Sequence, residues 1–111
     1  MLILDKLIFM YAPEARTVPA HFQALAHAVR LKIMERLAET EEQTVKDLAR
    51  HLGLSQPRVS WHLGMLRRGG AIRQRRQGRL VYCSIDFESI RRQQLLFWEL
   101  LNHKKRIGVN V

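Results

Sequence analysis

Apolar residues recur at intervals of three and four positions along most of the chain, which is the spacing of helices with one buried face. The pattern predicts helices over residues 1–12, 21–28, 29–39, 45–52, 56–68 and 87–103. The second and third of these are either two helices or one bent helix. Their predicted buried positions are Phe22, Leu25, Val29, Ile33, Met34 and Leu37. We therefore expect a mainly helical protein.

The spacing of apolar residues changes from 3.6 to 2 after Gly70. Alternating residues predict strands over 71–76 and 79–85, joined by a tight turn at the Gln77-Gly78 pair. In the second strand, the predicted apolar face consists of Val81, Cys83 and Ile85. A separate acidic run over residues 39–42 predicts a turn between helices. The fold class expected is mainly α with a small β-hairpin.

Residues 55–70 contain the signals that begin and end a helix. The Ser55 hydroxyl suits the N-cap because it can accept from a free backbone N–H, and Gly69 or Gly70 can take the left-handed conformation that ends a helix. The predicted inner stripe consists of Val59, Leu63 and Leu66. The outer stripe, which has no acid, consists of Pro57, Arg58, Trp61, Gly64, Met65 and Arg68. Such a face indicates an anionic partner.

The elements on either side of residues 55–70 place this helix in a known layout. Thr44 can cap the helix before it, and Gly53 ends that helix with one residue left before Ser55. Two helices joined by a tight glycine turn are the layout of a helix-turn-helix, whose second helix enters a DNA groove. The arginine-rich hairpin that follows is then expected to be a wing that reaches the DNA backbone or the minor groove.

Charge is distributed unevenly along the chain, which has 111 residues and the length of one small domain. The net charge is +9; residues 1–54 sum to zero and residues 55–111 carry the whole excess. One-sign charge of this kind predicts a polyanionic partner, with nucleic acid first and a membrane surface second. No pair of general acid and base, catalytic triad or phosphate-binding loop is recognisable, so we expect no enzyme.

The single cysteine, Cys83, rules out an internal disulfide framework and favours a reducing compartment. Its place on an apolar strand face predicts a small buried residue rather than a redox sensor. The longest apolar run, over residues 2–11, contains Asp5 and Lys6 and is too short to span a bilayer. It also lacks the basic leader and cleavage site of a signal peptide. We therefore expect a cytoplasmic protein with no membrane-spanning segment.

Candidate DNA contacts follow from side-chain chemistry. Gln56 and Arg58 can pair with adenine and guanine, whereas Ser60, His62 and the Ser55 amide suit phosphates. Packing inside the protein is an equal alternative for His62. Trp61 either contacts DNA or covers the wing. The predicted DNA-binding set is Ser55, Gln56, Arg58, Ser60, Trp61, His62, Arg67, Arg68, Arg73, Arg75, Arg76 and Arg79.

The first and last predicted helices carry more apolar surface than one small domain covers. The first stripe packs either on its own chain or across a dimer, and the last helix is expected to meet another subunit. The predicted interface consists of Leu4, Leu7, Ile8, Tyr11, Phe22, Ile90, Phe97, Trp98 and Leu101. The domain plan is an apolar arm (1–18), a DNA-binding domain (19–103) that ends in a dimerisation helix (86–103), and a basic tail (104–111).

Residues 22–89 resemble the ArsR/SmtB-type winged helix-turn-helix repressors. The segments that carry the resemblance are FQALAHAVRLKIMERL, TVKDLARHLGLSQPRVSWHLGMLRRGGAI and RQRRQGRLVYCSID. The resemblance implies a homodimer with the order α-α-α-α-β-β-α, in which residues 55–68 read the major groove of a palindromic operator. It further implies a transcriptional repressor that an effector releases. A protein-interaction module built on a degenerate winged helix is the alternative.

Metals are the best-known effectors of this family, and the chain departs from both family metal sites. Residues 45–52 lack the paired cysteines of one site. At the other, on the last helix, the aligned residues are Asp86, Glu88, Glu99 and Asn102, followed by His103, so the first alone matches. Asp86, Glu88, Glu99 and His103 from two subunits would form an oxygen-rich site suited to nickel or zinc. A capping aspartate and solvated polar residues are the alternative, and no other cofactor is implied.

Overall fold

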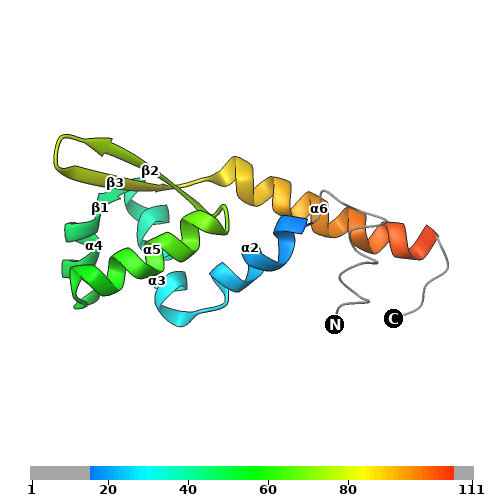
Figure 1. Ribbon diagram of the computed structural model, residues 1–111, viewed down its shortest axis with the longest axis horizontal. Helices are drawn as coiled ribbons and strands as arrows, with labels where there is room; N and C mark the ends of the chain where they lie inside the picture. The colour runs from blue at the N-terminus through cyan, green and yellow to red at the C-terminus, as the bar shows by residue number, and fades with distance from the viewer. Residues whose placement is uncertain (1–15, 107–111) are drawn as a thin grey trace.

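The computed structural model describes the backbone of residues 16–106 and the side chains of residues 16–102. Its helices are α2 (Val18–Leu25), α3 (Ala28–Thr40), α4 (Val45–Leu52), α5 (Gln56–Arg68) and α6 (Phe87–Arg106), and its strands are β1 (Glu42–Thr44), β2 (Ile72–Gln77) and β3 (Leu80–Ile85). Helices α2 to α5 gather with the sheet, and α6 leads away from them (Figure 1). The predicted first helix, with interface residues Leu4, Leu7, Ile8 and Tyr11, lies outside the described residues.

Helices α2 and α3 are separate, which decides between the two alternatives for this part of the chain. Helix α2 begins three residues earlier than predicted, with Pro19 in its first turn, where a missing N–H is tolerated. The chain then turns, and His27 takes an extended conformation before α3. The Nδ1 atom of His27 accepts a hydrogen bond of 3.1 Å from the Val29 amide and so caps α3.

Local capping fixes α4 and α5 around a short turn, as predicted. The Thr44 hydroxyl accepts a hydrogen bond of 3.1 Å from the Asp47 amide at the start of α4. Gly53 ends α4 with a left-handed φ of 68°. The Ser55 hydroxyl then accepts a hydrogen bond of 3.3 Å from the Arg58 amide and caps α5. These three residues fix where α4 begins and ends and where α5 begins.

The C-terminal end of α5 is held against α2. Gly70 has a φ of 71°, so the second glycine of the predicted pair takes the left-handed conformation. His21, which is 1% exposed, donates from Nδ1 to the Gly69 carbonyl at 2.6 Å. A Cβ at Gly69 would lie 2.5 Å from the Ala24 Cβ. The glycine pair therefore both ends α5 and lets α2 approach it.

The strands form an antiparallel sheet in the order β1-β3-β2. The sequence predicted the β2–β3 hairpin but not β1, whose three polar residues have no apolar alternation. The predicted turn was wrong by one residue: Gln77 pairs with Leu80, so Gly78 and Arg79 form the loop, with Gly78 at a φ of 63°. The turn expected in the acidic run lies at Glu41, where φ is 69°.

The core lies between α3, α4, α5 and the sheet. The large apolar side chains enclosed there are Ile33, Leu37, Leu48, Val59, Leu63, Leu66 and Cys83. The predicted inner stripe of α5 is confirmed. The prediction of a buried Phe22 was wrong: this side chain is 41% exposed, and its ring centroid lies 5.3 Å from that of Phe97 on α6.

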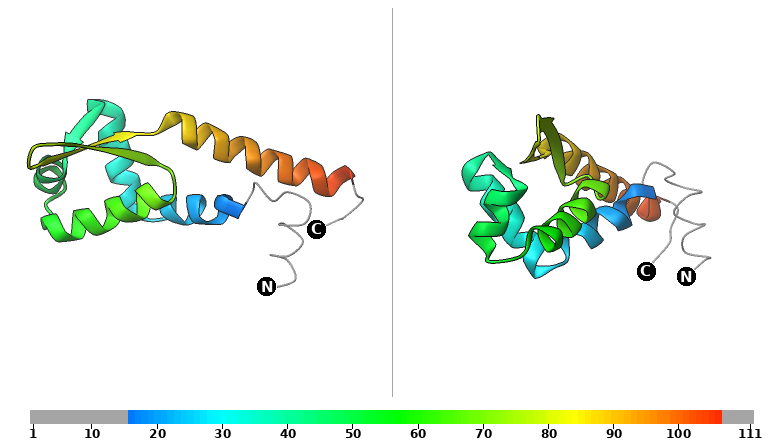
Figure 2. Two further views of the ribbon diagram at one scale, coloured as in Figure 1. Left: turned by 45° about the horizontal axis from the view of Figure 1, so that its top comes forward. Right: turned by 60° about the vertical axis from the view of Figure 1, so that its left-hand side comes forward.

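Helix α6 rests on α2 and then runs beyond the rest of the described domain (Figure 2). The Asp86 carboxylate accepts a hydrogen bond of 3.1 Å from the Ser89 amide, which confirms the predicted cap. Val18 of α2 packs against Leu96 and Leu100. The large apolar side chains that stay exposed on α6 are Phe87, Leu95, Phe97, Trp98 and Leu101. Within the described residues, one face of α6 therefore stays uncovered.

Candidate nucleic-acid interface

The outer face of α5 presents polar, basic and aromatic side chains to solvent. The exposed members of the predicted set on α5 and its cap are Ser55, Gln56, Arg58, Ser60, Trp61, Arg67 and Arg68. The sequence has no acid between Asp47 and Asp86, so no carboxylate from this part of the chain neutralises the arginines. The structure thus keeps this face basic.

His62 differs from the other α5 candidates because its side chain is 5% exposed. Its Nδ1 atom accepts a hydrogen bond of 3.4 Å from the Arg30 guanidinium, and its ring centroid lies 4.7 Å from that of His27. Burial lowers the pKa of His62 below its ordinary value, and the charges of His27, Arg30 and Arg58 lower it further. The geometry therefore favours the packed alternative for His62, with its Nδ1 atom occupied by Arg30.

Trp61 is 58% exposed and lies over the Arg30–His62 pair. Its ring meets that of His62 edge-on, with centroids 5.0 Å apart, and the Arg30 Cζ atom lies 5.8 Å from its centroid. These contacts connect α5 to α3. Trp61 thus covers the buried Arg30 guanidinium. The sequence had instead offered a cover over the wing as the alternative to DNA contact.

The wing arginines divide into two kinds. Arg73, Arg76 and Arg79 are exposed on β2 and the hairpin loop. Arg75 instead forms a two-contact ion pair with Glu42 on β1, with N–O distances of 2.8 and 3.2 Å. Its Cζ atom also lies 4.4 Å from the centroid of the Tyr82 ring. Arg75 is already paired within the protein, whereas the other three are positioned to meet an external anion.

A cavity of about 460 Å³ opens between the N-terminus of α3 and the outer face of α5. Its lining consists of His27, Pro57, Arg58, Trp61 and His62. Neither His27 nor Arg30 belongs to the DNA-binding set predicted from the sequence. The signal that could have indicated them is a second acid-free stretch, residues 15–34. This stretch contains both His27, which caps α3, and Arg30, which lies on α3.

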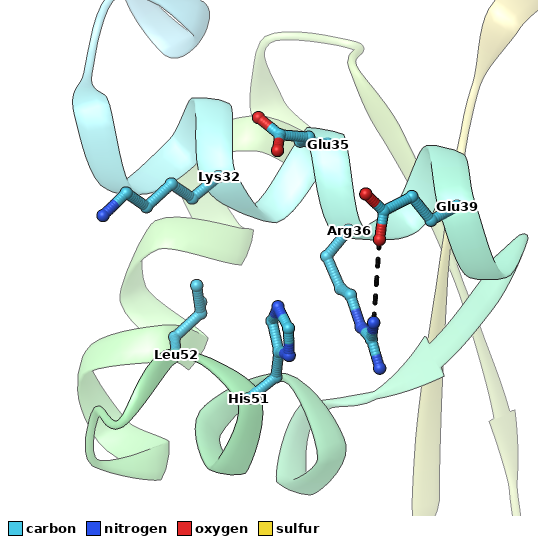
Figure 3. A pocket seen from close by; sticks show the side chains of 6 residues that line it. All are labelled: Lys32, Glu35, Arg36, Glu39, His51 and Leu52. Atoms are coloured by element: carbon cyan, nitrogen blue, oxygen red, sulfur yellow. Dashed lines mark ion pairs between the residues drawn. The ribbon is translucent and has the colours of Figure 1, made fainter.

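A second cavity, of about 310 Å³, lies between α3 and α4 (Figure 3). Arg36 reaches into it from α3 and pairs with Glu39 at 3.7 Å, while the His51 ring points toward α3 from α4. Lys32 and Glu35 also line this cavity. Cations and carboxylates are thus both present, so the charges of this cavity are balanced internally. The cavity beside α5 has no such balance.

The candidate metal residues whose side chains are described do not come together within one chain. Asp86 caps α6, and Glu88 and Glu99 are exposed on that helix. Glu99 lies thirteen positions after Asp86, which is about 20 Å along a helix. Among the described residues, no group of three or more His, Cys, Asp or Glu side chains is placed to hold a metal. The side chain of His103 lies outside the described part.

Comparisons with known proteins agree with this architecture. A family model of a helix-turn-helix domain matches residues 25–75. The chain is 39% identical over 69 residues to the arsenic resistance transcriptional regulator ArsR1 of Pseudomonas putida. The aligned segment covers 62% of this chain and 54% of that protein. It is 32% identical over 65 residues to the transcriptional repressor SdpR of Bacillus subtilis. That alignment covers 59% of this chain and 71% of SdpR.

Solved structures give the same result at the level of the fold. A crystal structure of an ArsR family transcriptional regulator matches with a TM-score of 0.66 and 29% identity, covering 78% of this chain and 93% of that chain. The chain belongs to the ArsR family. A second match is a solution structure from Mycobacterium bovis, described as the homodimeric winged helix-turn-helix DNA-binding domain of a possible ArsR-family regulator. Its TM-score is 0.63 at 29% identity, and the match covers 79% of this chain and 80% of that chain.

Membership in the ArsR family confirms the winged helix-turn-helix fold that the sequence resemblance implied. The chain spans about half the length of most of the curated relatives it matches, including ArsR1. None of the described helices α2 to α6 combines the length and hydropathy needed to span a bilayer.

Proposed function

We propose that this ArsR-family protein is a sequence-specific DNA-binding transcriptional regulator, a repressor that binds a palindromic operator as a homodimer. The observation that carries the proposal is the exposed, acid-free face of α5, held by Ser55 and Gly53 in a helix-turn-helix and followed by an arginine-bearing hairpin. Such a helix fits the major groove, and arginines beside it add sequence-independent attraction to phosphates. We propose no catalytic role. Because a transcriptional regulator binds DNA, we also propose a cytoplasmic location.

The exposed apolar face of α6 supports the homodimer. Trp98 is 62% exposed and Leu101 is 43% exposed, although both are apolar and lie on a regular helix. Phe22 and Phe97, whose rings are in contact, extend this surface toward α2. A second copy of the chain would bury these side chains and place two α5 helices at two half-sites. The structural relative from Mycobacterium bovis is described as homodimeric.

The effector is proposed separately, as nickel or zinc held by Asp86, Glu88, Glu99 and His103 from two subunits. Carboxylates and imidazole are suitable donors for these metals. Because Asp86 and Glu99 lie far apart on α6, each site would need two copies of the chain. DNA retardation titrated with nickel, zinc, cobalt and copper tests this idea: release of DNA by nickel or zinc is expected, and no response to either metal would contradict it.

Selection of duplexes from a random pool at 150 mM salt tests the proposed function. The expected product is an inverted repeat whose half-sites are separated by about one helical turn, or 10 base pairs. Retardation of DNA upstream of the protein's own gene then checks the recovered sequence. Binding that shows no sequence preference and disappears with added salt would overturn the proposal. It would favour the protein-interaction module, in which Trp61 and Met65 bind another protein.

A further inference from the structure

We propose that the cavity lined by His27, Pro57, Arg58, Trp61 and His62 is a phosphate-binding site that holds one DNA backbone phosphate in each half-site. This inference rests on the proposed function, because it names the part of the DNA that occupies the cavity. It assigns Arg58 to the backbone instead of a base edge. It also adds His27, on the N-terminal side of α3, to the residues that contact DNA.

The first argument is charge. Arg58 lines the cavity, and the Arg30 guanidinium lies behind its wall against His62. Both arginines come from stretches without Asp or Glu, residues 15–34 and 48–85. Within the described residues, no ion pair joins either arginine to a carboxylate. The cavity therefore attracts an anion that the described residues do not supply.

The burial of Arg30 strengthens this argument. The residue is 6% exposed, and its hydrogen-bond partners are neutral: the Ala24 carbonyl at 2.7 Å, the Gln23 carbonyl at 3.3 Å and the His62 Nδ1 atom at 3.4 Å. A buried charge without a counterion is unfavourable, so a nearby negative group stabilises the protein. A phosphate in the adjacent cavity would provide that group.

The second argument is hydrogen-bonding chemistry. The Nδ1 atom of His27 accepts from the Val29 amide, and the Nδ1 atom of His62 accepts from Arg30. Each neutral ring must then carry its hydrogen on Nε2, where it is a donor. With the Arg58 guanidinium, the polar groups of the lining are donors. A phosphodiester group, which is negatively charged and accepts hydrogen bonds without donating them, matches this set.

Trp61 gives the cavity a firm wall. Its ring meets that of His62 edge-on, with centroids 5.0 Å apart, and it covers the Arg30 guanidinium. The aromatic ring shields one side of the cations from water and so reduces the screening of their charge on that side. The cavity between α3 and α4 lacks this character, because Arg36 there is paired with Glu39.

Salt dependence and sequence preference together test the role of Arg58. Arg58→Gln should weaken binding to the selected duplex and to a mixed-sequence duplex alike. The slope of log affinity against log salt should fall by about one unit per subunit on both duplexes, with the preferred sequence unchanged. Loss of preference at one base pair, with an unchanged salt slope on the mixed duplex, would overturn the assignment and return Arg58 to base recognition.

Neutral methylphosphonate linkages, placed one at a time along a half-site, test His27. His27→Asn keeps an N-cap acceptor for Val29 but removes the imidazole donor. For wild type, one linkage position should cost about tenfold or more in affinity. At that position the cost should shrink about three- to tenfold in His27→Asn, because the variant has already lost that contact. It should persist in the control His51→Asn, which alters an exposed histidine on α4.

An undiminished methylphosphonate cost at every position in His27→Asn would overturn the phosphate site even if the protein binds DNA specifically. Failure of the proposed function has a different signature, namely the absence of any preferred sequence in the selection. In that case the mixed-sequence duplex still decides the inference, because the salt slope of Arg58→Gln requires no operator. Circular dichroism of each variant confirms that the fold is retained.

Discussion

Arg75 and Glu42 form a two-contact ion pair between β2 and β1, although they are 33 positions apart in the chain. One guanidinium nitrogen lies 2.8 Å from a carboxylate oxygen and Nε lies 3.2 Å from the other. The central strand β3 lies between these two strands and contributes Tyr82, on which the guanidinium stacks. The pair lowers the pKa of Glu42 and raises that of Arg75. It connects the wing to the strand that precedes α4.

This pairing predicts unequal contributions of the wing arginines to DNA binding. Arg79→Gln should lower the slope of log affinity against log salt by about one unit per subunit, because an exposed side chain that neutralises a phosphate releases a counterion. Arg75→Gln should change that slope much less, since its charge is already compensated by Glu42. Affinity measured by fluorescence anisotropy between 50 and 300 mM salt provides the comparison. Equal losses in the two variants would contradict the division.

The parts of the fold that the sequence predicted are those fixed by neighbouring residues. Ser55, Thr44 and Gly53 cap helices within three positions of themselves, so α4, its turn and α5 follow from local chemistry. Strand β1 and the Arg75–Glu42 pair depend on contacts between distant segments. A polar three-residue strand has no periodic signal, and a charge count cannot show which arginine is already paired.

The candidate site shows the same division. The exposed face of α5 followed from helical periodicity, because every position on a helix is set by its spacing. The contact of Arg30 with His62 spans 32 residues and depends on the packing of α3 against α5. For that reason the sequence left a phosphate contact and internal packing as equal alternatives for His62, and it predicted no role for Arg30. Phe22 was misplaced for a related reason, since one apolar residue on α2 faces α6 instead of the core.

Gly64 is expected to serve DNA binding at the expense of stability. Among the described side chains, the nearest neighbour of a Cβ there would be Arg68 at 3.9 Å, so this part of the protein leaves room for a side chain. Gly64→Ala should therefore raise the free energy of unfolding by about 0.5–1 kcal/mol. The same variant should bind DNA more weakly, because the added methyl group separates the helix from the groove. Urea denaturation and DNA retardation measure the two effects.

A matched glycine substitution provides the contrast. Gly70→Ala should destabilise the protein by more than about 1 kcal/mol, since its φ is 71° and a Cβ would lie 2.6 Å from the Ser89 hydroxyl. Its effect on DNA affinity should disappear once the folded fraction is taken into account. Unchanged DNA affinity in Gly64→Ala would remove the proposed reason for that glycine.

Cys83 should be unreactive in the folded protein. Its side chain is fully buried on β3, and burial raises the pKa of its thiol, so the reactive thiolate is scarce at neutral pH. Labelling with a thiol-specific disulfide reagent should be slow without denaturant and rapid in urea. DNA retardation should be the same before and after mild oxidation. Fast labelling of the folded protein, with loss of DNA binding, would instead make Cys83 a redox sensor.

Trp98→Glu should separate the proposed homodimer. The side chain is 62% exposed in one chain, and a buried, unpaired carboxylate at an interface is strongly unfavourable. Sedimentation should show a change from twice the chain mass to the 13.0 kDa of a single chain. Arg92→Glu, at another exposed position of α6, should stay dimeric. A wild-type protein that sediments as a single chain at micromolar concentration would contradict the dimer.

The stability of the protein should decrease in mild acid because of His62. Burial and the nearby cations hold its pKa below the ordinary value of 6.5, so near and below pH 6.5 the unfolded chain binds more protons than the folded one. This contribution to stability is fully present above pH 6.5 and is lost as the pH falls toward the lowered pKa. His62→Gln, which keeps an acceptor for Arg30, should flatten the urea midpoint between pH 5.5 and 7.5, whereas His51→Gln should behave like wild type. If the acid-side loss persists in His62→Gln, another group is responsible for it.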